Sequence, residues 1–80
     1  MMGENPLKTF TILIRARDAQ DDFHVMYEVI APDAEQAARF ALADMAARSE
    51  KALDVEHVEY TPVRNPLATP GVRFRTGRRY

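Results

Sequence analysis

One stretch, residues 33–51 with the sequence DAEQAARFALADMAARSEK, constrains the fold most, because its pattern is typical of an amphipathic helix. Pro32 ends the segment before it, and the Asp33 carboxylate can accept hydrogen bonds from the unpaired N–H groups of a first helical turn. The interior is rich in alanine and holds no glycine, proline or β-branched residue. At about 100° per residue, one stripe gathers the helix residues that we expect to be buried: Ala34, Ala38, Ala41, Leu42 and Met45.

Phe40 falls on the other side of this predicted helix, near Gln36, Ala43 and Ala47. One interpretation is a half-exposed ring that folds over the helix edge or is covered by the C-terminal segment. The other is an anchor that contacts a partner protein, since exposed aromatic rings flanked by small residues suit interfaces. The second interpretation makes Phe40 a candidate partner-binding residue.

Three segments alternate as strands do. Lys8–Arg17 and residues 23–31 each place apolar residues at every second position, which predicts two buried faces: Phe10, Ile12, Ile14 and Ala16 in the first segment, and Phe23, Val25, Tyr27 and Val29 in the second. Residues 54–61 predict a third strand with Val58 and Tyr60 in the core. Its alternation breaks at Val55, which indicates a bulge or a late start.

The order strand, strand, helix, strand predicts an α+β two-layer sandwich, ββαβ, with one helix packed on a small, mainly antiparallel sheet. The first strand is the most aliphatic, so we expect it between the second and the third. Residues 72–75 could add a short edge strand. On this interpretation residues 1–61 form the core domain, and residues 62–80 form a basic tail rich in proline and arginine.

The composition limits the class of protein. Eighty residues suffice for one small domain with one core. The chain has no cysteine, which fits a reducing compartment, and its longest aliphatic run is only Ile12-Leu13-Ile14. We therefore expect a cytoplasmic protein that does not enter a membrane.

No catalytic or cofactor-binding motif stands out. Ser49 is the only serine, and no histidine has the sequence context of a general base. His24 and His57 lack the spacing that a zinc site requires, and no glycine-rich loop is present to bind phosphate. The sequence predicts no catalytic residue, no metal site, no cofactor and no enzyme activity.

Charge divides the chain unevenly. Residues 1–61 hold all twelve acidic residues against six basic ones, a net charge of −6, whereas residues 62–80 hold five arginines and no acid. Arginines interleaved with aromatic rings suit an acidic protein surface, the phosphates and bases of nucleic acid, or the acidic body of the chain itself. The candidate partner-binding residues in this tail are Arg64, Arg73, Phe74, Arg75, Arg78, Arg79 and Tyr80.

The run VMYEVIAPDAEQAARFALADM, 21 of the 80 residues, resembles a strand–helix pattern common among small phage- and plasmid-encoded proteins. Several anti-CRISPR proteins show this kind of strand–helix–strand unit. The resemblance implies a stoichiometric inhibitor that binds a larger protein or ribonucleoprotein complex by occlusion. It carries no catalytic motif, and it assigns no role to any single residue.

The sequence as a whole predicts a non-enzymatic protein-interaction module, an accessory or inhibitor protein of a mobile element. Contact with the partner would use an exposed strand edge, Phe40 or the arginine-rich tail. Two alternatives stay open. One is a nucleic-acid-binding protein that uses the tail, and the other is a structural homodimer that pairs its sheet edges.

Overall fold

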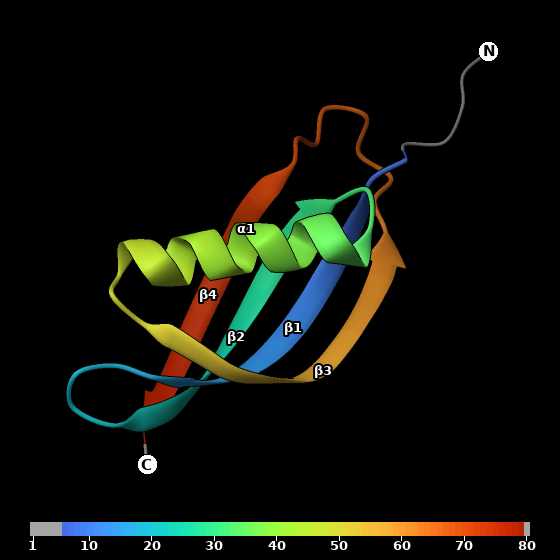
Figure 1. Ribbon diagram of the computed structural model, residues 1–80. Helices are drawn as coiled ribbons and strands as arrows, with labels where there is room; N and C mark the ends of the chain where they lie inside the picture. Colours follow the sequence, from blue (N-terminus) through green and yellow to red (C-terminus); the bar gives the residue numbers. More distant parts are fainter. Residues whose placement is uncertain (1–5, 80) are drawn as a thin grey trace.

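The computed structural model describes residues 6–79 of the chain, and the side chains of residues 6–77. One helix lies across one face of a four-stranded antiparallel sheet (Figure 1). The elements follow in the order β1 (Lys8–Arg17), β2 (Asp22–Ala31), α1 (Ala34–Ala47), β3 (Lys51–Pro62) and β4 (Gly71–Arg79). The predicted α+β class, with one helix on a small antiparallel sheet, is confirmed. A fourth strand extends the predicted order ββαβ to ββαββ.

The sheet has the strand order β3-β1-β2-β4, so β1 lies between β2 and β3, as its aliphatic sequence predicts. The alternation of β1 and β2 also predicts their faces correctly. Both predicted rows, from Phe10 to Ala16 and from Phe23 to Val29, are buried and face α1. The register of β1 with β3 shifts between Leu13 and Ile14, where Val55 pairs with Ile14, so the predicted bulge is confirmed. The central strands β1 and β2 supply most of the core.

The helix begins where its cap predicts, because the Gln36 amide donates a hydrogen bond of 2.8 Å to Asp33 Oδ1. It ends at Ala47, one turn before the predicted end. Ser49 adopts a left-handed backbone with a φ of 61°, and the Glu50 amide donates to the Met45 carbonyl at 2.9 Å. This turn redirects the chain, so Lys51 already belongs to β3.

The predicted buried stripe of α1 is confirmed at Ala41 and Met45 but wrong at Ala34 and Leu42, because the helix is rotated about its axis. The buried residues are Ala37, Ala41 and Met45, whereas Leu42 is 41% exposed. Phe40, which the sequence analysis placed on the far side, is half-buried and packs against the core. Phe40 therefore packs against the core, where the prediction placed Leu42. Burying the larger ring removes more apolar surface from water.

Strand β3 pairs with β1 along its whole length but contributes little to the core. Val58 and Tyr60 face the same side as the buried residues of β1, yet they are 43% and 56% exposed, so their predicted burial is wrong. The physical reason is that the sheet is wider than the helix. Four strands span three spacings of about 4.8 Å each, which exceeds the helix diameter of about 10 Å, so one edge of the sheet is left partly uncovered.

The C-terminal segment contributes β4, which pairs with β2 and is longer than the short edge strand that residues 72–75 suggest. The predicted basic tail thus contains a full member of the sheet, and only residues 63–70 form an irregular connection. In the described part of the chain, no helix is long and apolar enough to cross a membrane.

Candidate interaction surface

Arg75, predicted as a partner-binding residue, lies in a polar cluster that joins β4 to the rest of the domain. Its guanidinium donates to both carboxylate oxygens of Glu50, at 2.7 and 2.8 Å, and to the Tyr27 hydroxyl at 2.7 Å. The Tyr27 hydroxyl donates in turn to Asp44 Oδ2 at 2.7 Å. The guanidinium also lies over the Tyr27 ring, 5.4 Å from its centroid. We name Tyr27, Asp44, Glu50 and Arg75 the β4 tether, because they join β4 to β2, to α1 and to the start of β3.

The tether perturbs the acidity of its members. Burial of Tyr27 and the hydrogen bond to Asp44 raise the pKa of its phenol to about 12. The same hydrogen bond lowers the pKa of Asp44, and the hydrogen bonds to Glu50 raise the pKa of Arg75. The side chains of Arg75 and Glu50 are only 16% and 10% exposed. Arg75 is therefore occupied within the domain.

The other residues predicted for the tail lie at several places. Arg64 is exposed in the connection from β3 to β4, and Arg73 and Phe74 are exposed on β4. Tyr80 and the side chains of Arg78 and Arg79 lie outside the described residues. Among the described side chains, Arg73 and Phe74 are therefore exposed on β4, whereas Arg64 lies outside the sheet.

Phe40, the remaining predicted contact residue, sits on the flank of α1 that faces β4. Asp44, one turn further along the same flank, contacts Tyr27 and Arg75. Because the ring packs against the core, Phe40 presents only part of its surface to solvent.

The opposite flank of α1 and the inner face of β3 expose apolar side chains that sequence reasoning missed or assigned to the core. Leu42 lies on that flank, and Val55 is 43% exposed on β3, close to the values of Val58 and Tyr60. We name this row of four, Leu42, Val55, Val58 and Tyr60, the apolar strip. The sequence could have revealed these exposed residues through its number of elements, because a single helix cannot cover every strand of the sheet.

Tyr60 is the largest side chain of the apolar strip, and it is held in place from two sides. Its ring contacts the buried Phe10 ring, with centroids 5.5 Å apart, and the ammonium of Lys8 lies 5.6 Å from the Tyr60 centroid. A tyrosine that is both oriented and half-exposed loses little conformational freedom when a partner covers it.

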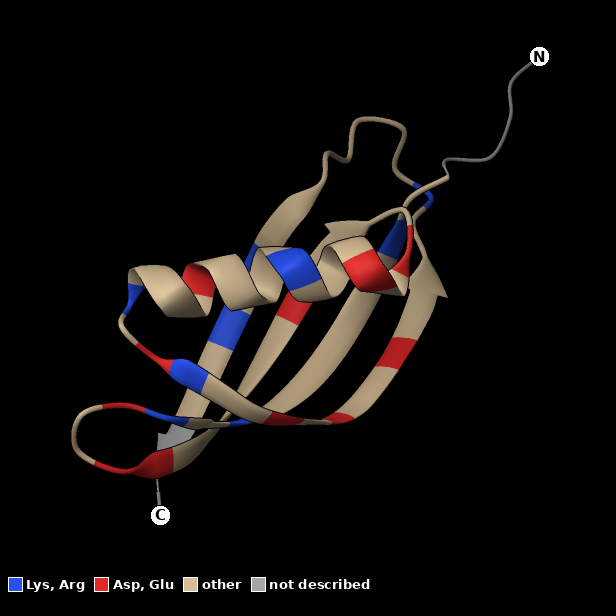
Figure 2. Cartoon of the chain, in the orientation of Figure 1, with Lys and Arg blue, Asp and Glu red and all other residues tan. Residues whose placement is uncertain are grey.

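Asp54 and Glu59 belong to the face of β3 that points away from α1. Figure 2 shows acidic positions in red along β3 and basic positions in blue on β4, at the opposite edge of the sheet. Glu56 Oε1 is hydrogen-bonded to His24 Nε2 at 2.9 Å, and Glu56 Oε2 lies 3.8 Å from Arg15 Nε. Glu59 pairs with the exposed His57 at 3.0 Å. These pairs are solvent-exposed, so each contributes at most about 1 kcal/mol to stability.

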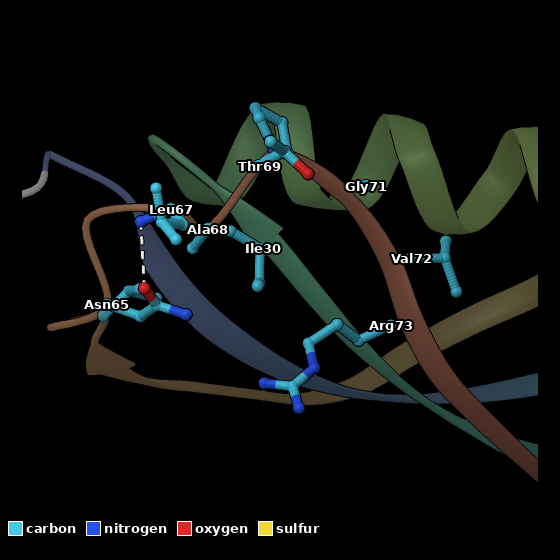
Figure 3. Close-up of a pocket in the computed structure, with 10 residues that line it drawn as sticks. Ile30, Asn65, Leu67, Ala68, Thr69, Gly71, Val72 and Arg73 are labelled. Carbon is cyan, nitrogen blue, oxygen red and sulfur yellow. Dashed lines mark hydrogen bonds between the residues drawn. The ribbon is translucent and has the colours of Figure 1, made fainter.

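The described residues line hollows on the surface of the domain. One, of about 340 Å³, lies beneath the connection between β3 and β4, and Figure 3 shows Arg73 reaching along it from β4. The Asn65 side chain, which lines this hollow, accepts a hydrogen bond of 2.9 Å from the Leu67 amide. Another, of about 400 Å³, lies on the face of the sheet opposite α1, over Leu13, His24 and Met26. Thr76 and Gly77 of β4 complete the lining of this second hollow.

Metal binding finds no support among the described residues, where no three potential ligands come together. The chain matches no family model, no curated protein and no solved structure. The resemblance to small mobile-element proteins therefore stays a prediction.

Proposed function

We propose that this chain is a non-enzymatic module that binds another protein along β3. The observation that carries the proposal is the apolar strip beside an unpaired strand edge. A twelve-residue edge strand with exposed valines and a tyrosine is a feature that soluble proteins otherwise avoid, because it templates further strand pairing. In an interaction module, the same feature offers main-chain hydrogen bonds and side-chain contacts together.

The distribution of charge favours protein over nucleic acid as the partner. The Arg75 guanidinium is occupied by the Glu50 carboxylate. The edge that offers the most apolar surface, β3, carries Asp54, Glu56 and Glu59, which repel phosphates. Stoichiometric binding of a protein is thus the function that the geometry supports best.

Site-specific photo-cross-linking tests the proposal. A photoreactive phenylalanine analogue replaces Tyr60 in one variant and Leu67 in the control, which is 83% exposed on the connection between β3 and β4. In cells that express the chain, irradiation should yield a discrete protein adduct from position 60 and none from position 67. Adding Val58→Lys should abolish the adduct. Equal adducts from both positions, or none from position 60, would refute binding along β3.

A further inference from the structure

The two edges of the sheet are oriented so that a second copy of the chain can continue it. The strands alternate in direction across the order β3-β1-β2-β4, so β3 and β4 run in opposite directions. A copy shifted along the sheet, with its helix on the same side, therefore brings its β4 antiparallel to β3. Antiparallel pairing is the geometry of every pair already in this sheet.

The charges of the two edges are complementary. Strand β3 carries Asp54, Glu56 and Glu59 against Lys51, a net charge of −2, and β4 carries four arginines and no acid. Glu56 and Arg75 are engaged within the domain, but Asp54 and Arg73 make no ion pair with any residue from 6 to 77. Pairing β3 with β3, or β4 with β4, opposes like charges, so electrostatics favours β3 with β4.

The same arrangement addresses the apolar strip. In each copy the β4 tether joins α1 to β4, while Val55, Val58 and Tyr60 on the inner face of β3 stay about half-exposed. The shifted copy places its own helix on the side of the sheet where Val55, Val58 and Tyr60 are exposed. A single second copy beside β3 could therefore both pair with its edge and lie on the side of its exposed apolar residues.

From these three features we infer that the partner of β3 is β4 of a second copy, in a head-to-tail assembly with one continuous antiparallel sheet. This inference rests on the proposed function, whose partner it identifies. Because the contact joins two different edges, it is heterologous and yields a closed ring or a filament rather than a twofold dimer.

Two charge-reversed variants of the full chain test the inference. The β3-reversed variant carries Asp54→Arg and Glu59→Arg, and the β4-reversed variant carries Arg73→Glu, Arg78→Glu and Arg79→Glu. Light scattering coupled to size exclusion should give the wild-type chain a mass that rises with concentration above 9.1 kDa. Each variant alone should stay at the monomer mass, and an equimolar mixture should recover the larger species. Circular dichroism checks that both variants keep their fold.

Ionic strength supplies a second measurement that needs no variant. The charges on two open edges are screened as the Debye length falls from about 10 Å at 0.1 M salt to about 3 Å at 1 M, so the association constant should fall by about tenfold. A wild-type chain that stays monomeric at every concentration overturns the inference, as does a β4-reversed variant that associates like wild type. If the Tyr60 position then still cross-links to a different protein, binding along β3 stands and only the second copy fails.

Discussion

Strands β3 and β4 close the same sheet at opposite ends, yet they are held in opposite ways. β4 is fixed by side chains as well as by its backbone ladder with β2, because Arg75 contacts Tyr27, Glu50 and Asp44. β3 is fixed mainly by its backbone ladder with β1, and the side chains on its helix side remain half-exposed. The comparison teaches that the two edge strands of one sheet can be secured to different degrees: a polar cluster joins β4 to α1, whereas the apolar side chains of β3 stay half-exposed.

The largest effect should come from breaking the β4 tether. Arg75→Met leaves the Glu50 carboxylate nearly buried without its partner, which should lower the free energy of unfolding by about 3–5 kcal/mol. Urea denaturation measures the loss. Arg73→Met, two residues away on the same strand, is the matched control and should cost less than about 0.5 kcal/mol. Equal losses from the two variants would show that the β4 tether stabilises the domain no more than an exposed arginine of the same strand does.

The second effect is a dependence on alkaline pH. The pKa of Tyr27 rises from about 10 in the unfolded chain to about 12 in the fold. A raised pKa means that its contribution is complete below pH 10 and is lost as the pH climbs toward 12, by about 2–3 kcal/mol.

Denaturant midpoints measured from pH 9 to pH 12 test this dependence. Tyr27→Phe is the control, because it removes the titrating phenol while lysines elsewhere still titrate. The wild-type chain should lose more stability across this range than the variant does. Parallel curves for the two proteins would contradict the coupling of Tyr27 to the tether.

The strand faces were predictable because each follows from local alternation. Phe10 to Ala16 and Phe23 to Val29 are buried as their period of two requires, and the break at Val55 marks a real bulge. The start of α1 was equally local, since Asp33 caps the turn that follows it. Patterns of this range need no knowledge of the rest of the fold.

The rotation of α1 and the role of Arg75 depend on contacts between distant residues. Alanines occur on all sides of α1, so its apolar stripe is weakly defined in the sequence. The rotation of α1 about its axis depends instead on the packing of Phe40 and on the hydrogen bond between Tyr27 and Asp44. Arg75 lies 48 residues from Tyr27, and its sequence context suits a partner protein, nucleic acid or the acidic body of the chain itself. Its ion pair with Glu50 agrees with the last of these. A sequence pattern does not reveal that an arginine will bridge a tyrosine and a glutamate. For the same reason, the exposure of Val58 and Tyr60 emerged only when a single helix was seen against four strands.

The smallest effects separate the two flanks of α1, each of which faces one edge of the sheet. Phe40→Ala should lower the free energy of unfolding by about 2 kcal/mol, less than a fully buried ring would lose, because Phe40 packs against the core but stays partly exposed. Leu42→Ala, on the flank beside the apolar strip, should cost no more than about 1 kcal/mol. Urea denaturation resolves both losses. At equal protein concentration, Leu42→Ala should weaken association of the chain more than Phe40→Ala does, since Leu42 borders the surface that a partner would cover. If Leu42→Ala proved the more destabilising change and left association intact, the helix would be packed toward β3, and the open edge would have to be sought on the side of β4.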